Sequence, residues 1–212
     1  RTKVTVDGTV ILKAKDETYA FKQMASLLIV DKSKDAKRFF VDDTGNLVER
    51  VLSIEELAED SQDTQFLCTS LQLGHNALTT LSFANFNAVM AQRFYRPTHV
   101  LTHLDLSFNM LSEVPSSLAQ LPLHSLLLHC NRIDALRGLL NLHHLSKTLK
   151  KFSVNENPIQ DSMGRKLKWT LLYCFPFLQS LDDVRVTSAD RDKIKLFGTM
   201  FGKNLHFLTA QG

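Results

Sequence analysis

The sequence predicts an α/β solenoid in which short parallel strands form a concave sheet, a helical cap closes the C-terminal end, and a small extension precedes the repeats. Three observations predict this fold. A pattern of leucines with one asparagine recurs four times between residues 68 and 159. Apolar residues at three- and four-residue steps, which are typical of helices, follow several of the copies. The pattern is absent from residues 1–62.

The most complete copy is "LTHLDLSFNML" at 101–111, which follows the pattern L-x-x-L-x-L-x-x-N-x-L. The other copies are "CTSLQLGHNAL" (68–78), "LHSLLLHCNRI" (123–133) and "LKKFSVNENPI" (149–159). Residues two apart on a strand share a face, so the paired apolar residues point into the core. An inward asparagine amide both donates to and accepts from backbone groups that the turn leaves unpaired. Four copies in register are typical of leucine-rich repeats, which bury their apolar faces only by stacking.

The spacing of the asparagines locates the helical returns. The spacings are 33 residues for Asn76 to Asn109, 22 for Asn109 to Asn131, and 26 for Asn131 to Asn157. The long first spacing contains "FANFNAVMAQRFYRP" (83–97), which predicts a helix that ends before Pro97. Leucines at three-residue steps predict a second helical segment at 136–145. A partial fifth copy, "LQSLDDV" (178–184), leaves the pattern after its second leucine.

The segment after the last copy predicts the helical cap. A helix at 162–174 would bury its leucines, with Trp169 covering the last rung of the sheet. Thr187 and Asp190 form a Thr-x-x-Asp start signal for a further helix at 188–197. Gly198 is expected to end that helix, which leaves residues 198–212 as a C-terminal tail.

The N-terminal extension, 1–62, is made of different elements. "KVTVDGTVIL" (3–12) alternates around an Asp-Gly pair and predicts a hairpin. "RFFVDDTGNLVERV" (38–51) predicts another hairpin, and "SIEELAED" (53–60) predicts a short helix. The extension is either a small sheet or an arm that orders on a partner. The repeat domain with its cap is expected at 63–197.

Composition narrows the function classes. The chain is 44% hydrophobic over 212 residues, enough for one sizeable core. Its net charge of +3 is not typical of a dedicated nucleic-acid binder. Its longest apolar runs, 24–30 and 171–178, are far shorter than the roughly 20 residues of a membrane span. No secretory signal is visible in the sequence. The chain begins with Arg1 rather than Met, which leaves open whether further residues precede it.

The three cysteines, Cys68, Cys130 and Cys174, are widely spaced and form no Cys-x-x-Cys motif. They favour a reducing compartment over a disulfide framework.

A family resemblance follows from the repeats together with their flanks. The segments "LQLGHNAL", "NFNAV", "LDLSFNML", "LLLHCNRI", "NENP" and "VTSADR" resemble the short axonemal leucine-rich-repeat family typified by leucine-rich repeat-containing protein 51. The similarity covers residues 66–195, whereas the N-terminal hairpins and the tail depart from it. It implies a cytoplasmic, cytoskeletal protein of the cilium or flagellum that binds other axonemal proteins. It implies no enzymatic activity.

The residues themselves give catalysis, cofactors and metals little support. There is no Gly-x-Ser-x-Gly or His-Glu-x-x-His motif. "GTMFGKN" (198–204) is one residue short of a phosphate loop, and Asn204 stands where a Ser or Thr would be needed. His143 and His144 are adjacent on a predicted helix, so we expect their rings to diverge, and no histidine has a recognised ligand spacing. The carboxylates of 182–190 fit the closure better than a catalytic pair.

The candidate site is therefore a protein-binding surface on the concave sheet, formed by strand residues outside the leucine slots and by the residues just after each strand. It comprises Gln72, His75, His103, Asp105, Phe108, Leu127, His129, Lys151 and Glu156. Phe108 and Leu127 are apolar where solvent exposure gives no reason for it, which is typical of a binding patch with a polar rim. Leu127→Glu is then expected to weaken partner binding without unfolding the chain.

Basic residues gather near the last rung and the cap: Lys147, Lys150, Arg165, Lys166 and Lys168. They form a solvated face, or they meet an acidic protein surface such as tubulin, or they meet RNA phosphates. Three function classes thus remain. The favoured one is a non-catalytic scaffold in a static axonemal assembly that involves no membrane. The alternatives are a subunit of an RNA–protein particle, spliceosomal or organellar, and a regulatory subunit of a phosphatase or dynein.

Overall fold

The structure is a computed structural model of the 212-residue chain. It describes residues 3–4, 9–14, 17–22, 28–31, 64–81, 86, 88, 90–91 and 97–209. The chain forms two compact units: Arg1–Leu73 with Ser82–Thr102, and Gly74–Leu81 with His103–Gly212. Among the described residues, no helix is long and apolar enough to cross a membrane.

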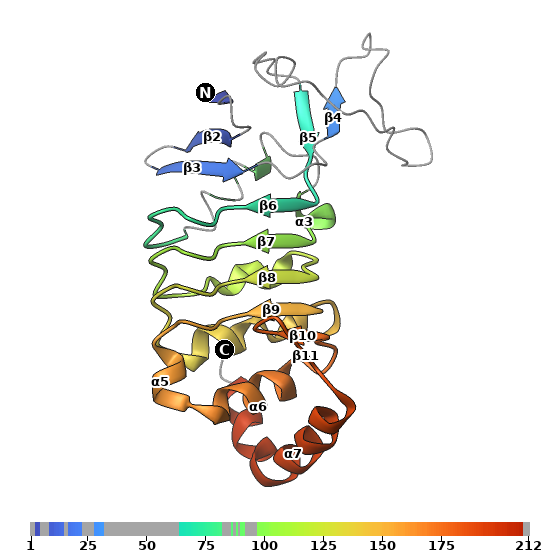
Figure 1. Cartoon of the computed structure of the whole chain (residues 1–212). Coiled ribbons are helices and arrows are strands. Elements are labelled where there is room, and N and C mark those ends of the chain that lie inside the picture. The colour runs from blue at the N-terminus through green and yellow to red at the C-terminus, as the bar shows by residue number, and fades with distance from the viewer. Residues whose placement is uncertain are drawn as a thin grey trace, which may run out of the picture. The chain divides into compact units, whose positions relative to one another are not determined.

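The first unit contains an antiparallel sheet in the order β1-β2-β3-β6 (Figure 1). The strands are β1 (Lys3–Val4), β2 (Thr9–Ala14), β3 (Glu17–Lys22) and β6 (Ser70–Gln72). The predicted hairpin at 3–12 is confirmed, because Lys3 pairs with Ile11 and Val4 with Val10. Strand β3 was not predicted, and its last residue pairs with Gln72.

A two-stranded antiparallel sheet of β4 (Leu28–Asp31) and β5 (Thr64–Leu67) completes the strands of this unit. The hairpin predicted at 38–51 and the helix predicted at 53–60 lie outside the described residues. The helix predicted at 83–96 is present at the described positions, where Phe86 and Met90 are buried. Pro97 begins α3 (Pro97–Val100), a position that suits proline because it needs no N–H there.

The second unit is a leucine-rich-repeat solenoid. Its parallel strands are β7 (His103–Asp105), β8 (Ser125–Leu127), β9 (Lys151–Ser153) and β10 (Ser180–Leu181) (Figure 1). Leu104, Leu126, Phe152 and Leu181 are aligned across the strands, and all four are buried. The inward positions of the repeat pattern thus form one continuous core, as the sequence predicts. Strand β11 (Val184–Arg185) pairs antiparallel with β10 and ends the sheet.

Short helical segments return the chain between these strands. They are the 3-10 helix η1 (Ser116–Gln120), the α-helix α4 (Leu136–Leu140) and the 3-10 helix η2 (Asn141–Lys147). The helical segment predicted at 136–145 is confirmed in place, although its second half is 3-10. The tighter 3-10 winding is common in short connecting pieces such as these.

The cap contains α5 (Ile159–Met163), α6 (Arg165–Cys174) and α7 (Ser188–Thr209). The single helix predicted at 162–174 is wrong, because the chain breaks at Gly164, whose φ is 52°. Trp169, predicted to cover the last rung, is only half-buried, whereas Phe175 is fully buried and its ring centroid lies 5.6 Å from that of Phe152 in β9.

The start of α7 matches the prediction and its end does not. The backbone N–H of Thr187 donates to Asp190 Oδ2 at 3.0 Å, and the Asp190 N–H donates to Thr187 Oγ1 at 3.2 Å, which is a reciprocal N-terminal cap. Gly198 does not end the helix, which continues to Thr209, so most of the predicted tail is helical. A Cβ at Gly198 would lie 2.7 Å from Tyr173 Cε2, so this glycine permits close packing of α7 against α6.

Candidate protein-binding surface

The turns after the strands are held by buried asparagines. Asn131 is 7% exposed, and its Oδ1 accepts the backbone N–H of Leu111 at 3.0 Å. Its Nδ2 donates to the carbonyls of Leu106 at 2.9 Å and Leu128 at 3.0 Å. Asn109 and Asn157 make equivalent bonds with their own neighbours. The predicted asparagine ladder is confirmed: each amide satisfies backbone groups of two successive rungs.

The residue before each asparagine has a left-handed backbone. The four are His75 (φ 57°), Phe108 (φ 52°), Cys130 (φ 54°) and Glu156 (φ 57°), and we call them the left-handed column. In this conformation the backbone N–H groups of the first three reach the next rung, each donating at 3.0 Å to the carbonyls of Ser107, His129 and Asn155. Successive side chains of the column are therefore spaced by about one strand separation, roughly 4.8 Å.

That spacing stacks flat side chains. The rings of His75 and Phe108 lie 4.2 Å apart between centroids at an angle of 11°, which is a parallel stack. The ring of His129 meets Phe108 edge-on at 5.1 Å and 84°. The His129 Nδ1 also lies 3.1 Å from Ser153 Oγ. Phe108 is 43% exposed, so this aromatic cluster (His75, Phe108 and His129) presents a fixed apolar ring to solvent.

Below the aromatic cluster, the column continues with Cys130 and Glu156. The Cys130 thiol donates to Glu156 Oε2 at 3.0 Å. Desolvation, followed by the neighbouring Glu156 carboxylate, raises the pKa of Cys130 to about 11. Burial also raises the pKa of Cys68 to about 12 and of Cys174 to about 11. All three thiols are therefore protonated at neutral pH, which disfavours them as nucleophiles.

The concave strand positions form rows across the sheet. One row aligns His103, Ser125 and Lys151, and the next aligns Asp105, Leu127 and Ser153.

In these rows His103 is exposed, but Leu127 is only half-buried, so it is less open to solvent than the sequence suggested. Neighbouring strands, each side chain about 4.8 Å from the next, cover part of its surface. Asp105 turns its carboxylate to its own chain, accepting the Ser107 N–H at 2.9 Å and the Ser107 hydroxyl at 2.6 Å.

The end of the sheet adds acidic residues that sequence reasoning had assigned only to closure. Asp182 Oδ1 accepts the N–H groups of Val154 at 2.7 Å and Asn155 at 2.9 Å, which supports the closure role. Asp183 pairs with Lys151 at 2.8 Å, and the hydrogen bond and charge of Lys151 lower the pKa of Asp183. The ion pair places a charged rim beside His129, and the partial fifth repeat was the signal that could have located it.

The predicted surface residues thus divide by location. His75, Phe108 and His129 come together, as do Lys151 and the unpredicted Asp183. Gln72 belongs to the first unit, where it pairs with Lys22.

The basic residues also divide. Lys168 is engaged, because its Nζ lies 3.0 Å from Asp190 Oδ1 and 5.0 Å from the centroid of the Trp169 ring. The other four, Lys147, Lys150, Arg165 and Lys166, are exposed, and none forms an ion pair with a described residue.

The histidines do not form a metal site within the part of the chain that the structure describes, where no group of three ligating side chains is found. The expectation that His143 and His144 diverge is wrong. Their ring centroids lie 4.0 Å apart at an interplanar angle of 38°, within the 3-10 helix η2.

The chain is similar to a number of solved structures, of which two are described. No protein-family model and no curated protein matches the chain. The Drosophila melanogaster SNF/U2A' complex contains a chain that is 19% identical, with a TM-score of 0.48 over 76% of this chain and 86% of that one. An internalin from Listeria monocytogenes is 16% identical, with a TM-score of 0.35 over 72% of this chain and 43% of that one. The geometry of the repeats therefore remains the basis for any functional argument.

Proposed function

We propose that this chain is a non-catalytic protein-binding scaffold and a structural component of a ciliary or flagellar axonemal complex. The observation that carries the binding role is Phe108, an exposed aromatic ring clamped between His75 and His129. Exposed aromatic side chains that are rigid before binding lose little conformational entropy on association. They are therefore efficient anchors for a protein partner.

The backbone at Phe108 strengthens this argument. A left-handed conformation costs an L-residue about 1 kcal/mol, a cost that glycine does not carry. None of the four left-handed column residues is glycine. The chain retains full side chains at each position, which supports a role for those side chains beyond folding. Elsewhere on the predicted surface, exposed His103, exposed Glu156 and the Lys151–Asp183 pair supply polar and charged groups that favour one partner over others.

The axonemal setting is supported by the resemblance of residues 66–195 to axonemal leucine-rich-repeat proteins. In that setting the partners are other cytoskeletal proteins of a static assembly. Tubulin is one candidate, because its acidic surface would complement the four basic residues that form no ion pair with a described residue.

The experiment is to tag the full chain in ciliated cells and measure its retention in the detergent-resistant axoneme. We expect wild-type protein to be retained and Phe108→Gly to lose at least about tenfold of that retention, as for a binding hot spot. Met110→Ala is the matched control, since Met110 is a 38% exposed apolar residue of the same turn outside the column. It should change retention less than twofold.

Two results would count against the proposal separately. Absence of the wild-type chain from the axoneme would remove the cellular setting. Equal retention of Phe108→Gly and wild type would remove the aromatic cluster as the binding surface.

A second candidate is a subunit of an RNA–protein particle. It is favoured by exposed Lys147, Lys150, Arg165 and Lys166, which have no ion pair with a described residue. RNase treatment would then release the partners, and binding would weaken steeply as salt rises. Partners that survive RNase treatment would favour the protein scaffold.

A further inference from the structure

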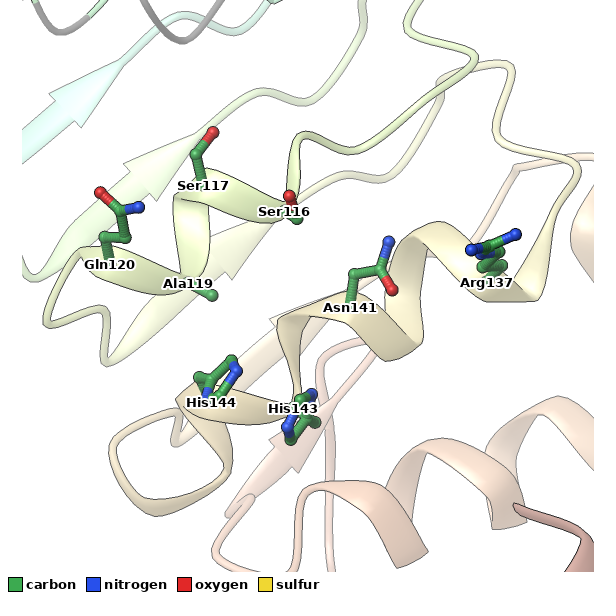
Figure 2. Close-up of a pocket in the computed structure, with 8 residues that line it drawn as sticks. All are labelled: Ser116, Ser117, Ala119, Gln120, Arg137, Asn141, His143 and His144. Atoms are coloured by element: carbon green, nitrogen blue, oxygen red, sulfur yellow. The ribbon is translucent and has the colours of Figure 1, made fainter. Parts of the chain in front are cut away.

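A second hollow surface lies on the helical side of the solenoid, away from the left-handed column. It is a pocket of about 680 Å³ between η1 and the α4–η2 segment (Figure 2). Its lining residues are Ser116, Ser117, Ala119, Gln120, Arg137, Asn141, His143 and His144.

The lining of this pocket is polar and contains no acidic side chain. Every lining side chain except Ala119 is polar, and none is acidic. Arg137 carries a permanent positive charge and five N–H donors. The acidic residues nearest in sequence, Glu113 and Asp134, do not line the pocket. The pocket is thus rich in donors and holds no carboxylate to compete for them.

The hydrogen-bond donors of the lining are also not used by other described residues. Apart from the contact between the two histidine rings, no lining side chain makes a hydrogen bond or ion pair with a described residue. Polar groups gathered around a hollow and left to solvent are available to a ligand.

We infer that this convex pocket binds an acidic segment of a partner protein. A guanidinium fork binds a carboxylate through two parallel hydrogen bonds, and Asn141, Gln120 and the serine hydroxyls can bond to a peptide backbone. Figure 2 shows Arg137 at one end of the pocket and His144 toward the other, with Asn141 between them, so an extended segment would meet several donors in turn.

Two other classes of ligand fit less well. Nucleic acid is bound chiefly by rows of lysine and arginine, and this pocket holds one permanent cation. An amphipathic partner helix requires an apolar groove, and Ala119 is the single apolar side chain of the lining. The inference is independent of the aromatic cluster, so a result that disproves binding at one surface leaves the proposal for the other unaffected.

The test measures binding of a fluorescein-labelled octaglutamate peptide to the full chain by fluorescence anisotropy at low salt. We expect Arg137→Gln to weaken binding about tenfold, because a hydrogen-bonded charge contributes about 1.5 kcal/mol or more. Arg132→Gln is the matched control: Arg132 is exposed on the same repeat, does not line the pocket, and loses the same charge. It should change affinity less than twofold.

A second variant blocks the pocket without changing charge. Ala119→Phe places a ring in the hollow and should weaken peptide binding at least about fivefold, whereas Phe108→Gly should leave it unchanged. Circular dichroism and thermal unfolding confirm that each variant is folded.

Three outcomes would overturn the inference. The first is equal weakening by Arg137→Gln and Arg132→Gln, which indicates diffuse charge attraction. The second is tighter binding of an octauridylate RNA than of octaglutamate at the same salt concentration. The third is no measurable binding of octaglutamate to the wild-type chain.

Discussion

Two adjacent columns of residues in the repeat turns differ in how strictly the fold determines the residue type. Where the left-handed column has His, Phe, Cys and Glu, the next position in every repeat is asparagine: Asn76, Asn109, Asn131 and Asn157. The two columns are one residue apart along the chain and share the same turns. Yet one is uniform and the other is different in each repeat.

The difference comes from what each turn requires. Beside the asparagine, the turn leaves both N–H and C=O groups unpaired, and an amide side chain is what satisfies both kinds. At the preceding residue the turn requires only a backbone conformation, and the side chain points outward. The fold therefore dictates chemistry at one position and leaves it open for recognition at the next.

The largest effect is expected in the dictated column. Asn131→Ala would leave Leu111 N–H and the carbonyls of Leu106 and Leu128 buried without this partner. We expect a loss of about 3 kcal/mol in the free energy of unfolding, measured by urea denaturation. Cys130→Ala, the neighbouring substitution, should cost less than about 0.5 kcal/mol. Equal losses for the two variants would erase the distinction between the columns.

Two helical glycines give a second contrast, between a position where packing requires glycine and one where it does not. Gly198→Ala gains helix propensity but loses more through overpacking, because its Cβ would lie 2.7 Å from Tyr173 Cε2, so we expect a net destabilisation of about 1 kcal/mol. Gly138→Ala, in α4, has 3.6 Å to its nearest neighbour and should stabilise by up to about 1 kcal/mol through helix propensity. Thermal unfolding of the two variants should therefore shift in opposite directions, and shifts of the same sign would contradict the packing role of Gly198.

The cap of α7 gives a smaller, pH-dependent effect. Hydrogen bonds from the backbone N–H and hydroxyl of Thr187, and then from Lys168, hold the pKa of Asp190 far below its usual range. Asp190 therefore stabilises the fold above the ordinary carboxyl pKa of about 4, and this contribution is lost as pH falls toward the lower pKa of the folded state. Asp190→Asn should cost about 1 kcal/mol at pH 7, as for other helix caps, and less below pH 4.

The control for this prediction is Asp192→Asn. The Asp192 side chain is 74% exposed and, among the described residues, forms an ion pair with Lys195 alone, at 3.4 Å, so its replacement should change stability by less than about 0.3 kcal/mol at any pH. A constant difference between Asp190→Asn and wild type from pH 7 to pH 3 would contradict the assigned cap.

Apart from the control substitutions, the smallest net change in stability is expected at Phe108. In Phe108→Gly, relief of about 1 kcal/mol of backbone strain offsets the loss of aromatic contacts of similar size. Urea denaturation should place the variant within about 0.5 kcal/mol of wild type. A loss as large as that of Asn131→Ala would show that Phe108 is part of the fold and not only of its surface.

The same division explains what the sequence predicts well. The strands, the asparagine ladder and the Thr187–Asp190 cap follow from local spacing, and the structure confirms them. Strand β3 was missed although it pairs with the adjacent β2 from Thr9–Lys22 to Ala14–Glu17, because the two residues between the strands, Lys15 and Asp16, are not one of the Asn-Gly or Asp-Gly pairs that mark a hairpin in sequence. Gly198 was misread because a glycine that ends a helix and one that admits a neighbouring ring look alike in sequence.

The candidate surface was predictable in membership but not in geometry. His75 and Phe108 were identified by their position after the strands, yet their stacking depends on the left-handed φ angles that the ladder imposes. The solvent exposure of Leu127 was overestimated, because neighbouring strands partly shield an outward side chain in a tightly spaced sheet. The convex pocket left no signal, since its lining comes from three segments with no shared pattern.

At the C-terminal end of the sheet, Asp182 directly follows β10 and bonds the preceding repeat. Its carboxylate accepts two backbone N–H groups. When ionised it has no hydrogen to donate, so it cannot bond to the backbone carbonyls of a further repeat as an asparagine amide does. The two-residue β11 then turns back over the last parallel strand, with Arg185 exposed on it. Short, charged edge strands resist edge-to-edge association. This end of the sheet is therefore poorly suited to pairing with the sheet of a second copy of the chain. Partner binding at the two proposed surfaces then does not compete with end-to-end association of the chain.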